Sequence, residues 1–367
     1  MKMKKLVAML ACVALGATLF AGCGSSSSSS DSSAAADTTE EAAEETAEET
    51  TEEATEEAAA DTTSAGGTIY YLSPSMGILY WQWVEDGVQQ ACDEAGYTLV
   101  TYDAENSTEA QATNAETAIT AGAAGIVLSP VSSTSCPGVL DPAEEAGIPV
   151  AIAAIGTDEG VENYLYFASA DDETSGYDAG TFLCERAAEL GGDSIGVISL
   201  PMDRSNAQAK TRGLEKACEE QNITIAQTIQ CADLTVSEAD GLVRDLLTAN
   251  PDIKGIYCMY EQAGTAAAAV LEDLGLEGTI SIVSSDGSPE STALIREGKI
   301  DGQVLQEAVG QGLYAGQAVI NYLENGGDIL GHEVNETPEP LVTTDNIDDP
   351  ESQAVLALTY PESAGAY

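Results

Sequence analysis

Basic side chains and histidine are scarce in this chain. Its 367 residues include 12 lysines and arginines and one histidine, against 62 acidic residues, for a formal net charge of −50. A nucleic-acid-binding protein needs a basic surface that displaces counterions from phosphates, so this balance excludes that class. The lone histidine, His332, argues against a histidine-rich metal site and against a Ser-His-Asp hydrolase. We therefore expect no metal, no cofactor and no enzymatic activity.

Long hydrophobic runs are also missing, with one exception near the N-terminus. The apolar run from Leu6 to Ala21 follows a lysine-rich start and, at about 16 residues, is short for a membrane span. It predicts a signal peptide over residues 1–22. The closing L-F-A-G-C at 19–23 resembles a bacterial lipobox, which makes Cys23 the predicted lipidation site; an ordinary signal peptide with a chance cysteine is the alternative. A lipid anchor would hold the protein on the extracytoplasmic face of the cell membrane, at the cell surface or in the periplasm, without other membrane contact.

Aromatic and large aliphatic residues are absent from residues 24–65, which carry thirteen acids and no base. Such a segment cannot bury enough apolar surface to offset the entropy lost on ordering, and its like charges repel one another. We therefore expect residues 23–66 to form the lipidated cysteine and a disordered acidic tether. The part that follows keeps a net charge of about −40.

Closely spaced cysteines are lacking as well. Apart from Cys12 and Cys23, the chain has six, none in a C-x-x-C pair: Cys92, Cys136, Cys184, Cys218, Cys231 and Cys258. Their spacing fits neither metal ligation nor a compact disulfide scaffold. We expect buried thiols, and the sequence leaves one disulfide open.

From Gly67 onward, short β-rich runs alternate with helical patterns of about 15–20 residues. Several helical patterns end in glycine, at Gly96, Gly147 and Gly275, where a left-handed cap is needed. The strand runs are apolar on both faces, which is typical of parallel sheets covered by helices on both sides. The expected strands are 68–72, 97–102, 125–129, 148–153, 165–168, 194–200, 224–229, 255–259, 279–284 and 302–305. Ten strands favour two α/β lobes with a ligand cleft beyond the strand ends.

Five short motifs follow one another in this part of the chain. They are Asp86-Gly87, A-G-A-A-G-I-V-L-S-P at 121–130, E-E-A-G-I-P-V at 144–150, L-L-T-A-N-P-D-I at 246–253 and S-D-G-S-P at 285–289. Because these motifs occur in this order and spacing, the chain resembles the type I periplasmic solute-binding proteins of ABC importers, in particular the ribose- and galactose-binding-like group. The resemblance implies two Rossmann-like lobes joined by three hinge strands, a cleft between the lobes, and an ABC transporter permease as docking partner. We expect a monomer.

The resemblance also implies the domain boundaries. The N-lobe would comprise residues 67–168 and 307–340, and the C-lobe residues 169–306 and 341–345, followed by a C-terminal tail at 346–367. The three crossings would fall near Ala168–Asp172, Gln306–Glu307 and Leu341–Thr343.

Aromatic residues are rare, yet three of them open the first helical pattern. In the resembled family, an aromatic pair at the positions of Tyr80 and Trp81 stacks on a sugar ring, a contact that suits the flat apolar face of sugars. Trp83 is a further candidate. Packing in the core or between the lobes is the alternative for all three.

Polar candidates lie at strand ends and at the crossings. Asp286 follows a strand, where its carboxylate would face the cleft, although it could instead cap the next helix. Asp286 and Gln306 match ligand residues of the family. Asp172, near the first crossing, is either a ligand contact or a hinge or cap residue.

At several positions the chain departs from the family's pattern. Ala154-Ile155 replaces an Asp-Arg pair, Gln208 replaces the arginine that enters from the C-lobe, with Arg204 nearby, and Tyr260 replaces an asparagine. Gln208 and Tyr260 are therefore further candidate ligand-binding residues. Losing both arginines removes bidentate donors for sugar hydroxyls. We therefore expect a pocket poor in cationic groups and a small, polar, neutral or cationic ligand, sugar-like and delivered to an ABC importer. The alternatives are a nucleoside-like or amine-bearing ligand, and a sensory receptor that docks a signalling partner.

Overall fold

The structure is a computed structural model, and it describes residues 66–361. The signal peptide, the lipidation site Cys23 and the acidic tether up to residue 65 lie outside the described residues. Within 66–361, no helix combines the length and hydrophobicity that a membrane crossing requires.

The first of two six-stranded sheets is entirely parallel, in the order β11-β5-β4-β3-β1-β2. Its strands are β1 (Thr68–Ser73), β2 (Thr98–Asp103), β3 (Gly125–Leu128), β4 (Val150–Ala153), β5 (Tyr166–Ala170) and β11 (Glu333–Thr337). Strands β3 and β4 are buried along their whole length. This burial on both faces is the reason that they appear in the sequence as continuous apolar runs.

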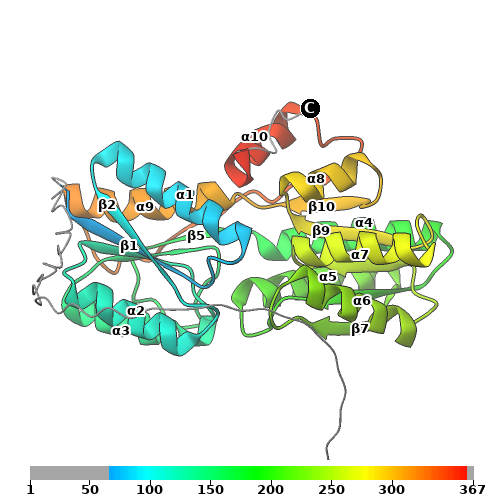
Figure 1. Cartoon of the computed structure of the whole chain (residues 1–367), viewed down its shortest axis with the longest axis horizontal. Coiled ribbons are helices and arrows are strands. Elements are labelled where there is room, and N and C mark those ends of the chain that lie inside the picture. Colours follow the sequence, from blue (N-terminus) through cyan, green and yellow to red (C-terminus); the bar gives the residue numbers. More distant parts are fainter. Residues whose placement is uncertain (1–65, 362–367) are drawn as a thin grey trace, which may run out of the picture. The chain divides into compact units, whose positions relative to one another are not determined.

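Helices cover both faces of this sheet (Figure 1). On one face lie α1 (Leu79–Ala95) and α9 (Ala308–Asn325), and on the other α2 (Thr108–Thr120) and α3 (Pro137–Ala146), with the short 3₁₀ helix η1 (Ser133–Ser135) before α3. We call these elements the N-lobe. Helices α1 and α3 end at Gly96 and Gly147, whose φ angles of 76° and 71° confirm the expected left-handed caps.

The second sheet has the order β12-β10-β9-β8-β6-β7 and is parallel except for the β10–β12 pair. Its strands are β6 (Ser194–Ser199), β7 (Thr224–Gln230), β8 (Gly255–Cys258), β9 (Ser281–Asp286), β10 (Gly302–Leu305) and β12 (Leu341–Thr343). Its helices are α4 (Asp172–Glu189), α5 (Ser205–Gln221), α6 (Val236–Ala249), α7 (Glu261–Leu274) and α8 (Pro289–Arg296). We call these elements the C-lobe. The ten expected strands are all present, with ends that differ from the expected ones by at most two residues.

The chain passes between the two sheets three times. It crosses after β5, between β10 and α9, and between β11 and β12. Leu341–Thr343, expected as the third crossing, is itself a strand of the second sheet, and the passage precedes it at residues 338–340. Strand β11 was not expected, because it is a largely exposed edge strand whose sequence, E-V-N-E-T, contains no apolar run.

The segment expected as a C-terminal tail contains a helix, α10 (Pro350–Thr359), which contacts α9 and β10. Tyr360, which follows it, is fully buried. Its ring meets Trp83 edge-on, with ring centroids 5.7 Å apart. The chain therefore stays packed against the lobes as far as Tyr360.

In two pairs of helices, α1 with α9 and α4 with α5, the backbones of the two helices are in direct contact. A Cβ atom on Gly312 of α9 would overlap the carbonyl oxygen of Val84 in α1, and one on Gly87 of α1 would overlap that of Val309. In the same way, Gly213 of α5 lies against the backbone of α4. Only glycine permits this separation, so these positions set how α1 meets α9 and how α4 meets α5.

Candidate ligand-binding site

A pocket lies where the start of α1, in the N-lobe, meets the strand ends of the C-lobe. Five of the residues expected to bind ligand line it, together with aliphatic and polar side chains that were not expected. The lining residues are Ile78, Tyr80, Trp81, Ala154, Leu200, Arg204, Asn206, Leu234, Met259, Tyr260, Gln262, Asp286 and Gln306. The free space among them is about 40 Å³, room for about one water molecule.

Asp286 and Gln306 are joined inside this pocket. Gln306 Nε2 donates to Asp286 Oδ1 at 2.6 Å, and the backbone N–H of Glu261 donates to Asp286 Oδ2 at 3.1 Å. Ser288, rather than Asp286, caps α8, because its Oγ accepts from the backbone N–H of Ser291. The Asp286 carboxylate therefore does not cap α8, but at the pocket it accepts a hydrogen bond from the backbone N–H of the first residue of α7.

The aromatic candidates separate into two groups. Trp81 is 5% exposed and meets Tyr80 edge-on, with centroids 4.9 Å apart. The Tyr80 hydroxyl donates to Gln311 Oε1 at 2.7 Å and lies 3.5 Å from Gln306 Oε1. Trp83 does not line the pocket, because it points toward Tyr360 and a separate surface hollow.

Both arginine positions of the resembled family are replaced in this chain, yet one arginine lines the pocket. Arg204, the N-cap residue of α5, lines the pocket, is 4% exposed and donates from Nε to the carbonyl oxygen of Val131 at 3.0 Å. Burial lowers the pKa of Arg204 to about 10, which still leaves it charged at neutral pH. Gln208, the residue at the family's arginine position, lies one helical turn later, is exposed and donates to the carbonyl oxygen of Met202.

Next to Arg204, hydrogen bonds tie the two lobes together. Ser133, in η1, donates its backbone N–H to Asp203 O of the C-lobe, while its Oγ donates to Gly156 O within the N-lobe. Ser205, at the start of α5, donates its backbone N–H to Ser133 Oγ at 2.8 Å, and its own Oγ accepts from the N–H of Gly156 at 2.8 Å. These bonds hold the lobes closed beside the pocket.

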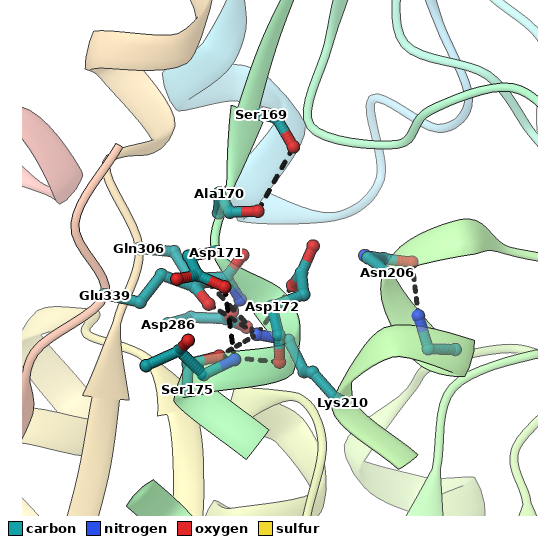
Figure 2. Close-up of polar contacts among 12 residues, drawn as sticks. Ser169, Ala170, Asp171, Asp172, Ser175, Asn206, Lys210, Asp286, Gln306 and Glu339 are labelled. Atoms are coloured by element: carbon teal, nitrogen blue, oxygen red, sulfur yellow. Dashed lines mark hydrogen bonds and ion pairs between the residues drawn. The ribbon is translucent and has the colours of Figure 1, made fainter. Parts of the chain in front are cut away.

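Asp172 belongs to a different cluster, shown in Figure 2. Its Oδ1 lies 2.8 Å from Nζ of Lys210, a fully buried lysine of α5. The same Nζ lies 3.0 Å from Oε2 of Glu339 and donates to Ser175 Oγ at 3.2 Å. Asp172 follows the first crossing and Glu339 lies in the third, so one C-lobe lysine binds two segments that connect the lobes (Figure 2).

More carboxylates than cations are buried here, and the pKa values of these carboxylates are raised. Burial raises the pKa of Glu339 to about 7 and that of Asp286 to about 6, and burial together with the nearby Asp286 raises the pKa of Glu261 to about 8. Burial disfavours the charged Lys210, but the charges of Asp172 and Glu339 outweigh it and raise the lysine pKa. The lysine is therefore cationic, and Glu339, Asp286 and Glu261 are the groups that titrate near neutral pH.

These raised values predict that the protein loses stability as the pH rises from 5 to 8. In the unfolded chain the three carboxyl groups titrate near pH 4, so between pH 4 and 8 the folded state binds more protons than the unfolded state. The free energy of unfolding then falls with pH, by about 2 kcal/mol or more. Urea unfolding at pH 5, 6, 7 and 8 measures it, and Glu339→Gln should flatten the profile. Stability that rises over this range would contradict the prediction.

Similarity to known proteins agrees with this geometry. Residues 69–328 match a family model described as a periplasmic binding protein domain. The chain belongs to this family. The type I two-lobe fold is thereby confirmed, as is the expectation of a binding protein that is not an enzyme.

Curated and solved periplasmic binding proteins resemble the chain over most of its length. The ribose import binding protein RbsB of Escherichia coli is 24% identical over 225 residues, 61% of this chain and 73% of that protein. A xylitol-binding protein of Mycolicibacterium smegmatis is 24% identical over 292 residues, 79% of each chain. The crystal structure of a galactofuranose binding protein matches with a TM-score of 0.73 at 19% identity, covering 80% of this chain and 99% of that one.

Within the described residues of this binding protein, no group of three or more His, Cys, Asp or Glu side chains is arranged to hold a metal ion. The polar side chains at the pocket are instead the carboxylate of Asp286, the guanidinium of Arg204, the amides of Asn206, Gln262 and Gln306, and the hydroxyls of Tyr80 and Tyr260. These groups suit hydrogen bonds to a polar organic ligand.

Proposed function

We propose that this protein captures a small, neutral, sugar-like solute outside the cytoplasm and delivers it to the permease of an ABC importer. The observation that carries the proposal is the pocket in which Trp81, Arg204, Asp286 and Gln306 meet. Relatives of similar sequence are named for ribose and xylitol, which supports a polyhydroxylated ligand.

The chemistry of the pocket suits a molecule with both hydroxyl donors and oxygen acceptors. The Asp286 carboxylate accepts charge-assisted hydrogen bonds from hydroxyl groups, and the guanidinium of Arg204 donates to ring or hydroxyl oxygens. Trp81 supplies an apolar surface on which the C–H-bearing face of a sugar ring can stack. Because one cation and one carboxylate line the pocket, a neutral ligand fits its charge best.

Ligand entry requires the lobes to separate. The present free space is too small for a pentose, and Tyr80, Gln306 and Asp286 hydrogen-bond to protein atoms within it. Opening breaks the contacts of Ser133, Ser205 and Arg204 across the lobes. A ligand that replaces these bonds in the closed form shifts the equilibrium toward closure.

We further propose that Cys23 is acylated and that the acidic segment after it spaces the binding protein from the membrane. The lipobox-like residues 19–23 support this. The intact mass of the exported protein tests it, since an unacylated N-terminus would contradict it.

Asp286→Asn is expected to weaken ligand binding about tenfold or more, since hydrogen bonds to a charged group contribute about 1.5–3 kcal/mol. The wild-type chain is first screened by thermal shift against ribose, arabinose, allose, galactofuranose, xylitol and myo-inositol, and calorimetry then measures the affinity and stoichiometry of any hit. The matched control is Gln208→Ala, on the exposed side of α5, with an expected change below about twofold. The absence of any hit in the panel, or an Asp286→Asn protein with unchanged affinity, would count against the proposal.

A further inference from the structure

We propose that Cys184 and Cys218 form a disulfide that joins α4 to α5. Their sulfur atoms lie 3.6 Å apart, and the two residues are 0% and 3% exposed. Among the six cysteines of residues 66–361, all of them buried, these two are the pair whose sulfur atoms contact each other. The four others lie on other elements.

The packing of the two helices explains why the sulfur atoms meet. Gly176, Gly180 and Cys184 recur every four residues and so share one face of α4, the face that packs on α5. A Cβ atom on Gly180 would lie 2.9 Å from a methyl group of Leu214 and 3.0 Å from Cβ of Ala217. The glycines bring the helix axes closer than large side chains would allow, and the cysteines extend the same contact line.

A disulfide needs its two Cα atoms within about 7 Å of each other and its sulfur atoms about 2 Å apart. The sulfur atoms are 3.6 Å apart, so the bond requires them to move closer by about 1.6 Å through side-chain rotation and a small adjustment of the helices. The contact is inside one lobe, so the bond would not oppose opening and closing of the cleft.

The reaction is a two-electron oxidation by a disulfide compound. One thiolate attacks a sulfur atom of the oxidant and expels a thiolate, and the second cysteine then displaces the remaining half of the oxidant. The S–S bond formed in the protein replaces the one broken in the oxidant, which leaves as two thiols carrying the two protons. Because both cysteines are buried once α4 and α5 have packed, the exchange takes place during folding. Periplasmic binding proteins act outside the cytoplasm, where disulfides persist.

The bond would close a loop between residues 34 positions apart and so restrict the unfolded chain. It should raise the unfolding temperature of the oxidised protein by about 5 °C or more over the reduced protein. The pocket residues Arg204 and Asn206 lie at the N-terminus of α5, whereas Cys218 lies toward its C-terminal end. Ligand affinity should therefore be unchanged by oxidation.

The test refolds the full chain in a buffer of oxidised and reduced glutathione, blocks free thiols with N-ethylmaleimide and digests without reductant. Cleavage after glutamate releases peptides 174–185 and 216–219, each with one cysteine. The expected result is a species with the summed mass of the two peptides less two hydrogens, which separates on reduction. This readout uses the wild-type protein and does not depend on a variant folding.

Cys184→Ser should abolish the linked species and the difference in unfolding temperature between oxidised and reduced protein. Cys92→Ala, which removes another buried cysteine, should keep both. Finding Cys184 and Cys218 both alkylated after refolding, or either one joined to a different cysteine, would overturn the proposal.

Discussion

Lys210→Met is expected to destabilise the protein by about 3–5 kcal/mol at pH 8, the usual result of removing one partner from a buried ion pair. Lys210 is fully buried and is the cation that Asp172 and Glu339 contact. Methionine has a similar volume but no charge, so it would leave two carboxylates buried without a counterion. Denaturant unfolding of the wild-type and variant chains measures the difference.

The loss of stability caused by Lys210→Met should be smaller at pH 5 than at pH 8. At pH 5 the carboxyl group of Glu339, whose pKa burial raises to about 7, takes up a proton and no longer needs the lysine charge. The matched control is Lys216→Met in the same helix, an exposed lysine that lies over the ring of Tyr177, with an expected change below about 1 kcal/mol. Equal losses for the two variants, or a deficit independent of pH, would show that the buried charge is not the cause.

Gly312→Ala is expected to destabilise the protein by about 1–3 kcal/mol, because the new methyl group has no space. It would overlap the carbonyl oxygen of Val84, a backbone atom of α1 that no side-chain rotation can move aside. Inside a helix, alanine is more favourable than glycine by about 0.5–1 kcal/mol. This gain is smaller than the loss caused by the overlap. The helices must separate, which also disturbs the neighbouring Gln311 and its hydrogen bond from Tyr80 at the pocket.

Gly241→Ala is the control, because the same change should have the opposite sign there. Gly241 lies inside α6 with nothing within 4 Å of a new Cβ atom, so only the helix preference acts and stability should rise by about 0.5–1 kcal/mol. Thermal or urea unfolding of both variants provides the comparison. If Gly312→Ala were neutral or stabilising, the backbone contact between α1 and α9 would not be as close as described.

The sequence alone predicted ten of the strands and the two-lobe fold. Apolar runs and helix-ending glycines are local signals, so the ten strands and their order along the chain could be read directly. Residues that follow strands in parallel sheets meet at one edge, which is why Asp286, Tyr260 and Gln306 line the same pocket. The start of α1, with Tyr80 and Trp81, faces the same edge.

The tertiary structure decided which polar groups reach the pocket and which serve the fold. Arg204 and Gln208 are one helical turn apart, and the packing of α5 turns the first into the pocket and the second toward solvent. Asp172 finds its partner, Lys210, far away in the sequence, and Glu339 joins them from the third crossing. Periodicity shows which residues share a helix face. Which neighbouring helix that face packs against depends on backbone contacts between segments far apart in the sequence. No local sequence pattern encodes these contacts.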